Sequence, residues 1–154
     1  MDFRLKGMAR KYHQGKFKPK NPQKYQGDPT NVIYRSSWER LVFVWLDNHP
    51  ACIGWNSEEV VIPYISPVDQ KPHRYFLDVK ATFKYQDGSK KTFLIEIKPY
   101  SQTLPPKNTT NKKRLLEESM TYAVNQAKWE AATKYAKKYG YEFKVITEKE
   151  IGIK

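Results

Sequence analysis

The amino-acid sequence predicts a mixed α/β fold with one small sheet. Two stretches have the apolar spacing of amphipathic helices, at about residues 36–48 and 112–139. Short strand-like runs lie between and after them, at residues 58–65, 73–85, 92–98 and 141–147. The order helix, strands, hairpin, helix, strand is typical of a small sheet that packs against helices.

The composition is that of a globular protein with one domain. The 154 residues are enough for a proper core, and no apolar run is long enough to span a membrane. Cys52 is the only cysteine, so an intrachain disulfide is impossible and a cysteine-based zinc site is not expected. The beginning of the chain lacks the apolar core of a signal peptide, which favours a reducing, cytoplasmic setting.

The formal net charge of +12 in a chain of 18.2 kDa indicates a polyanionic partner. Nucleic acid is the most common partner of this kind, and the aromatic content is consistent with it. A ribosomal protein or a membrane-surface protein would match the charge alone.

The first 30 residues contain eight Lys or Arg side chains and two aspartates. Tyr and Phe are interleaved with the lysines, and no helical or strand period is sustained. We interpret residues 1–30 as a basic arm that becomes ordered mainly on a partner, followed by a folded domain at residues 31–154. The alternative is a solvated, disordered tail. In the first interpretation Lys16, Lys18 and Lys20 are expected to contact DNA phosphates.

The first helix is expected to begin at Ser36 or Ser37, either of which can be its N-cap. It ends at Asn48, shortly before Pro50. Its apolar stripe consists of Trp38, Leu41, Val42, Trp45 and Leu46.

Strand signals follow this helix. Pro63 marks the run 58–65 as an edge strand or a strand end. The longer run 73–85 is followed by Asp-Gly at 87–88 and then by the run 92–98, which predicts a hairpin.

A connector at residues 99–114, rich in Pro, Thr and Lys and without an acidic residue, forms a second basic patch. It leads to the second helix, roughly Lys112 to Tyr139, which Gly140 ends. A last strand and a short terminal turn complete the chain. The expected apolar stripe of the helix is Leu116, Met120, Ala123, Ala127, Ala131 and Tyr135.

The run 92–98 carries charge where a central strand should be apolar. Side chains alternate along a strand, so Glu96 and Lys98 share one face while the other face is entirely apolar. The hairpin brings Asp78 beside this strand. For Asp78 to lie level with Glu96, we expect a bend or bulge near Asp78.

Asp78, Glu96 and Lys98 together suit the metal-dependent hydrolysis of a phosphodiester. Mg²⁺ prefers carboxylate oxygens and keeps several waters, which leaves room for a phosphate oxygen and an attacking water. The metal lowers the pKa of that water and neutralises charge in the transition state. The lysine can orient or deprotonate the water, or stabilise the pentavalent phosphate.

Glu39 on the first helix is a further candidate, because it shares a side of the helix with apolar residues and faces inward. It is either a further metal ligand or the acidic partner of a capping box that begins at Ser36. The alternative for Asp78 is a solvent-facing strand residue. For Glu96 with Lys98 it is a surface ion pair beside a sheet edge.

The pattern Asp78…Glu96-Ile97-Lys98, with Glu39 upstream on a helix, resembles the PD-(D/E)xK nuclease superfamily. The stretches SSWERLVFVWLDNHP, HRYFLDV and FLIEIKPYSQT are similar to two of its branches. One is the endonuclease subunit of heteromeric transposases, and the other is the head-completion nuclease of large T-even-like tailed phages. The stretch FKPKNPQKYQGDPTNVIYRSSWE favours the phage branch and extends the resemblance over nearly the whole chain.

The resemblance implies an α/β fold with a restriction-endonuclease-like core, in which helices flank a small mixed β-sheet. It implies that Glu39, Asp78 and Glu96 bind metal and that Lys98 is catalytic. Leu77 stands where the motif name has proline, which leaves the register of Asp78 open.

Several basic side chains outside the expected arm are expected to contact DNA: Arg35, Arg74, Lys112, Lys113 and Lys128. Trp129 is interpreted as a packing residue rather than as a wall of a DNA groove.

The expected function is a Mg²⁺-dependent DNA endonuclease, with Mn²⁺ as a possible substitute. The resemblance implies that it trims packaged DNA during phage head completion, in the host cytoplasm or in the virion head. Its partners would be double-stranded or branched DNA and portal or neck proteins, and no membrane. The alternatives are a non-catalytic DNA-binding head protein and a transposase- or repair-type endonuclease subunit.

Overall fold

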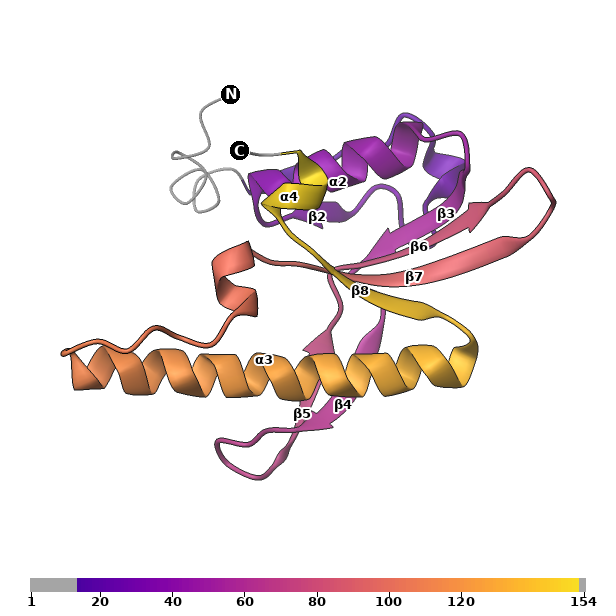
Figure 1. Cartoon of the computed structure of the whole chain (residues 1–154). Helices are drawn as coiled ribbons and strands as arrows, with labels where there is room; N and C mark the ends of the chain where they lie inside the picture. The colour runs from indigo at the N-terminus through magenta and orange to yellow at the C-terminus, as the bar shows by residue number, and fades with distance from the viewer. Residues whose placement is uncertain (1–13, 153–154) are drawn as a thin grey trace.

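The computed structural model of the protein describes residues 14–152, and its centre is a four-stranded mixed sheet (Figure 1). The strand order is β3-β6-β7-β8. The first three strands pair antiparallel, and β8 runs parallel to β7. Helices flank this sheet, which confirms the predicted fold class. The strands are β3 (Cys52–Ser57), β6 (Val79–Lys84), β7 (Lys90–Ile97) and β8 (Glu142–Ile146).

The two long helices, α2 (Ser37–Asn48) and α3 (Lys112–Tyr139), lie on opposite sides of the sheet (Figure 1). On the α2 side, Ile95 of β7 belongs to a buried cluster with Phe43. On the α3 side, Leu94 belongs to a second cluster with Trp129. Strand β7 is therefore buried on both faces, and this places Glu96 between the sheet and α3 rather than in solvent.

Helix α2 has the predicted bounds. Ser36 is its N-cap, and the Ser36 hydroxyl accepts a hydrogen bond from the backbone N–H of Glu39 at 3.2 Å. Of the predicted stripe, Trp38, Val42 and Leu46 are buried, whereas Trp45 is 54% exposed. The last turn of the helix is thus only partly covered.

The predicted long strand at 73–85 is instead two strands that belong to different sheets. Strand β5 (Pro72–Phe76) pairs with β4 (Val61–Ile65) in a separate two-stranded sheet, and β6 begins at Val79. The chain bends at Asp78, between the two sheets. The predicted β6–β7 hairpin is present, and Gly88 has the positive φ of 86° that its turn requires.

Helix α3 also has the predicted bounds, and Gly140 ends it with a φ of 74°. The predicted apolar stripe is confirmed only at its C-terminal end, where Ala131 and Tyr135 pack against the buried cluster. It is wrong at the other end, because Leu116 is 61% exposed and Met120 is 40% exposed. Only the C-terminal half of the helix packs on the sheets, and the N-terminal half extends beyond them (Figure 1). Its buried residues are Asn125, Trp129, Ala132 and Ala136.

Residues 14–30 pack on the domain, which differs from the expected partner-dependent arm. Strand β1 (Gly15–Phe17) pairs with β2 (Val32–Tyr34), and the ring of Phe17 packs edge-on against Trp55. A short 3₁₀ helix, η2 (Pro22–Lys24), precedes the buried Tyr25. Apolar contacts of these aromatic rings order the segment without a partner. The rest of the expected arm, residues 1–13, lies outside the described residues.

The side chain of Lys24 caps the C-terminal end of α2. Its Nζ donates to the backbone carbonyls of Leu46, Asp47 and His49 at 3.0, 2.8 and 2.8 Å. These carbonyls have no partner within the helix, so the ammonium satisfies them and complements the helix dipole.

The connector and the end of the chain contain two further short helices. These are η3 (Tyr100–Thr103) and α4 (Glu148–Ile151), the second with a full capping box at Thr147. In the part of the chain that the structure describes, no helix is both long enough and apolar enough to cross a membrane.

Candidate active site

Asp78 and Glu96 lie level with each other at one end of the sheet. Strands β6 and β7 pair Lys80 with Leu94 and Val79 with Ile95, and the next step of this register is Asp78 opposite Glu96. No bulge is needed to reach this position. The bend at Asp78 instead turns the chain out of the β4–β5 sheet.

Glu96 is 4% exposed and is held by two hydrogen bonds to the same oxygen. The Tyr75 hydroxyl donates to Oε2 at 2.9 Å, and the Trp129 indole Nε1 donates to Oε2 at 3.1 Å. Tyr75 comes from β5 and Trp129 comes from α3, so three elements converge on this carboxylate. A buried carboxylate with two donors on one oxygen is fixed in orientation.

Asp78 is half-buried and hydrogen bonds to Glu96. Its Oδ2 also accepts a hydrogen bond from the backbone N–H of Ile97 at 2.8 Å. Burial raises the pKa of Asp78 well above its usual range, and the hydrogen bond to Glu96 and the Glu96 charge raise it further.

The pKa of Glu96 shifts in the opposite direction. Burial alone would raise it, but the Asp78 hydrogen bond, the Lys98 charge and the donors Trp129 and Tyr75 lower it overall. The pKa values of the two carboxyl groups are therefore moved apart, with that of Asp78 above and that of Glu96 below its usual range. Adjacent carboxyl groups of this kind can bind a divalent cation in place of protons.

Lys98 follows directly after β7, and its backbone N–H donates to the Ile146 carbonyl at 3.0 Å. It lies close enough to Glu96 for its charge to lower the pKa of that carboxyl group. The Glu-x-Lys spacing therefore brings an ammonium group to the side of the strand that carries the carboxylates.

Glu39 lies at the start of α2 and near the carboxyl pair. Its carboxylate accepts a hydrogen bond from the backbone N–H of Arg35 at 3.3 Å, one residue before the N-cap, so the capping box is only half formed. Its charge also contributes to the raised pKa of Asp78, which places it near the pair. Burial raises the pKa of Glu39 itself, and the charge of Glu58 adds to this.

The donor set suits a magnesium-type cation at Asp78 and Glu96. Mg²⁺ is commonly held by one or two carboxylates, with waters and phosphate oxygens completing the shell. Among residues 14–152, no group of three or more His, Cys, Asp or Glu side chains has a geometry that could hold a metal ion. Glu39 is thus a neighbour of the carboxyl pair rather than a third member of a preformed cage.

The predicted DNA contacts are distributed unevenly around this site. Lys128 lies near it, with Nζ 5.5 Å from the ring centre of Tyr75, and Arg35 lies near it through Glu39. Arg74 instead lies over the ring of Phe76, at 5.5 Å, on the exposed side of β5. The remaining side chains are exposed and are not brought to the carboxyl pair by any contact in residues 14–152: Lys16, Lys18, Lys20, Lys112 and Lys113.

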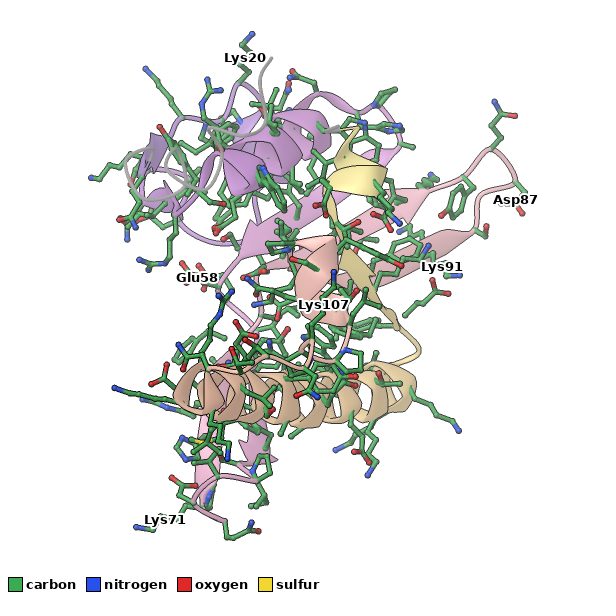
Figure 2. The ribbon with its side chains drawn as sticks, turned by 60° about the vertical axis from the view of Figure 1, so that its left-hand side comes forward. Lys20, Glu58, Lys71, Asp87, Lys91 and Lys107 are labelled. Atoms are coloured by element: carbon green, nitrogen blue, oxygen red, sulfur yellow. The ribbon has the colours of Figure 1, made fainter. Side chains whose placement is uncertain are left out.

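Three residues of the site were not assigned to it from the sequence. Trp129 packs in the core as expected, but its indole also binds Glu96. The Tyr75 hydroxyl donates to Glu96. Glu58 lies in the gap between α3 and the end of the molecule that carries Lys20 (Figure 2). The alternation of β5, with Tyr75 as its one buried residue, was the available signal for Tyr75.

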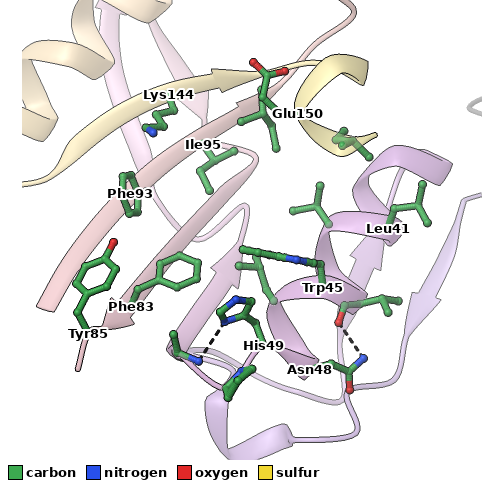
Figure 3. A pocket seen from close by; sticks show the side chains of 17 residues that line it. Leu41, Trp45, Asn48, His49, Phe83, Tyr85, Phe93, Ile95, Lys144 and Glu150 are labelled. Atoms are coloured by element: carbon green, nitrogen blue, oxygen red, sulfur yellow. Dashed lines mark hydrogen bonds between the residues drawn. The ribbon is translucent and has the colours of Figure 1, made fainter. Parts of the chain in front are cut away.

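The opposite face of the sheet carries a separate pocket of about 1010 Å³ between α2, α4 and the strands (Figure 3). Its lining is mainly apolar and includes Trp45, Phe83, Phe93 and Ile95. Ile95 points away from the side of β7 that carries Glu96. The pocket is therefore distinct from the carboxyl site.

Comparisons with known proteins identify the family of the chain. Residues 49–148, which include Asp78, Glu96 and Lys98, match the family model described as TnsA-like endonuclease N terminal. The chain is also 44% identical over 141 residues to a protein of Enterobacteria phage T4 named head completion nuclease, and the match covers 88% of this chain and 91% of that one. No solved structure matches the chain. The chain therefore belongs to the TnsA-like endonuclease N-terminal family.

Proposed function

We propose that the protein is a divalent-metal-dependent DNA endonuclease that acts in phage head completion. The observation that carries this proposal is the hydrogen-bonded pair Asp78 and Glu96 with Lys98 beside it, at one end of the sheet. The family match and the name of the phage T4 relative support the same activity and the same stage of assembly.

In this proposal Asp78 and Glu96 bind Mg²⁺, for which Mn²⁺ can substitute, and Glu39 is a further ligand or a residue that binds a metal-bound water. The cation supplies charge neutralisation at the phosphate and a water of lowered pKa when it is bound. Tyr75 and Trp129 keep Glu96 in one orientation, so that its second oxygen remains available.

Lys98 acts on the water or on the phosphate. As an ammonium it orients the attacking water or stabilises the negative charge that develops on the phosphate oxygens, and as a neutral amine it accepts the proton of the water. Both roles require Lys98 to be close to the carboxyl pair, and both predict loss of cleavage when the ammonium is removed.

The substrate in this proposal is double-stranded or branched DNA. Phosphate contacts come from Arg35 and Lys128 close to the site, and from Lys16, Lys18, Lys20, Arg74, Lys112 and Lys113 further away. The net charge of +12 supports binding that weakens steeply with salt. Portal or neck proteins are proposed as partners, and the host cytoplasm, with the virion head as a second location, as the place of action.

The test is cleavage of linear, branched and supercoiled DNA with Mg²⁺ or with EDTA, comparing the wild type with Glu96→Ala. Glu130→Ala is the matched control, because Glu130 is an exposed carboxylate on α3. Products that need metal and disappear only in Glu96→Ala support the proposal and identify the preferred DNA shape. Binding without cleavage by the wild type would instead support a non-catalytic head protein.

A further inference from the structure

Glu58, between β3 and β4, is tied to the residues that lead into the active site. Its backbone N–H is shared between the carbonyls of Leu77 and Asp78, at 3.2 and 3.3 Å. Its φ of 57° lies in the left-handed region, which a residue with a side chain rarely adopts. A glycine at this position would adopt the same backbone conformation with less strain. The stability of the fold therefore does not explain why a glutamate is present.

The carboxylate of Glu58 holds the side chain of Arg35. Arg35 Nε lies 2.9 Å from Oε1 and 3.1 Å from Oε2 of Glu58. The terminal nitrogens of the guanidinium, Nη1 and Nη2, make no hydrogen bond within residues 14–152. The backbone N–H of Arg35 meanwhile donates to Glu39. Arg35 is therefore linked to the site at both ends, with its terminal nitrogens open to a ligand.

An arginine whose Nε is held by a carboxylate is preorganised to bind a phosphate. Its planar guanidinium can give Nε to a carboxylate and keep the terminal nitrogens for a second anion, which a lysine cannot do. Because the side chain is already oriented, less conformational entropy is lost on binding.

We propose that Glu58 is a positioning residue of the nuclease, which orients the Arg35 guanidinium toward a DNA phosphate next to the one that is cleaved. This inference rests on the proposed function and extends it. In this proposal the acidic Glu58 strengthens the binding of the anionic DNA, and it does so only through Arg35.

The sign of this effect makes it testable. Removing a negative charge from a DNA-binding surface ordinarily strengthens binding, because repulsion of the phosphates is relieved. A positioning role predicts the reverse for Glu58→Gly. The same substitution removes the backbone strain, so the variant is expected to fold and to be at least as stable as the wild type.

Two variants are matched controls. Glu59→Gln removes one negative charge at the next residue, whose side chain is exposed. Gln70→Gly removes the side chain at the other non-glycine residue with a positive φ among those described, 60°, at the tip of the β4–β5 hairpin. Neither substitution is expected to weaken DNA binding.

The experiment measures the affinity for a fluorescently labelled linear duplex in EDTA by anisotropy, and the cleavage rate of the same duplex in Mg²⁺. We expect Glu58→Gly to raise Kd and KM about three- to tenfold, with kcat nearly unchanged, because it removes substrate binding and not a transition-state contact. In an Arg35→Ala background, Glu58→Gly is expected to have no further weakening effect.

Binding by Glu58→Gly that equals or exceeds that of the wild type would overturn the inference. An additional loss in the Arg35→Ala background would also overturn it, because Glu58 would then act by another route. If the wild type does not cleave the duplex, the proposed function fails. The anisotropy measurement in EDTA still decides whether Glu58 orients Arg35 toward DNA, because it does not depend on cleavage.

Discussion

Tyr75 of β5 and Trp129 of α3 donate hydrogen bonds to one and the same carboxylate oxygen, Oε2 of Glu96. Residues that orient a metal-binding carboxylate usually contribute about 10- to 100-fold to activity. We therefore expect Tyr75→Phe to lower kcat about tenfold or more and to leave DNA affinity unchanged. Tyr64→Phe, on the neighbouring strand, is the control, and equal cleavage rates for the two variants would contradict the prediction.

Asp78→Asn is expected to stabilise the metal-free protein at neutral pH while it abolishes cleavage. The pKa of Asp78 is raised in the folded state, so the protonated side chain favours folding. This contribution to the free energy of unfolding is complete only below the pKa of the unfolded state, and it is lost as the pH rises through the folded-state pKa. An asparagine cannot ionise, so it removes the cost of a buried negative charge, and its side-chain oxygen can still accept the hydrogen bond from the Ile97 N–H.

Urea unfolding in EDTA at several pH values measures this effect. The stability difference should be about 1 kcal/mol in favour of Asp78→Asn at pH 8 and should disappear below about pH 3, where the aspartate is protonated in both the folded and the unfolded state. A variant that is less stable than the wild type at every pH would show that the carboxyl pair contributes favourably to folding.

Lys98→Ala is expected to reduce cleavage by about 10²- to 10⁴-fold, the range typical of general acid–base and electrostatic groups. Duplex affinity should change little, because the basic surface remains. The matched control is Lys134→Ala, which removes an exposed ammonium from α3. If both variants lose affinity and cleavage in equal proportion, Lys98 is a phosphate contact rather than a catalytic residue.

Lys24→Met is expected to lower the free energy of unfolding by about 1 to 2 kcal/mol, because three backbone carbonyls at the end of α2 lose a charged donor. The Asp47 carbonyl keeps the Asn21 side-chain amide as a donor, and the His49 carbonyl keeps the backbone N–H of Cys52. Lys20→Met is the control, since the side chain of Lys20 is exposed. Chemical denaturation measures both. Unchanged stability would show that water replaces the ammonium without cost.

Helix bounds were predictable because their signals are local. Ser36 at the start of α2 and Gly140 at the end of α3 act through hydrogen bonds to the adjacent turn. The hairpin was also predictable, since the Asp-Gly turn determines its own geometry. The turn also brings Asp78 beside the strand of Glu96, but the register that places them level became known only from the pairing of Val79 with Ile95.

Contacts between distant elements were less predictable. Strand β3 was not expected, because Gly54 and Asn56 give it the composition of a turn, and its burial comes from α2 and residues 14–30. The covered side of α3 depends on where β4 and β8 lie, which periodicity alone does not show. The role of Trp129 required knowing that its indole reaches a carboxylate from a strand 33 positions earlier in the chain.

The turn at Gly88 lies at the far end of the hairpin from Asp78 and Glu96, yet it sets their alignment. The alignment of Asp78 with Glu96 therefore depends on the length of the hairpin more than on the identity of its exposed residues. A substitution at the tip leaves the two carboxylates level, whereas the insertion of a single residue moves one past the other. The alignment is kept through a change of hairpin length only where the two arms change length together.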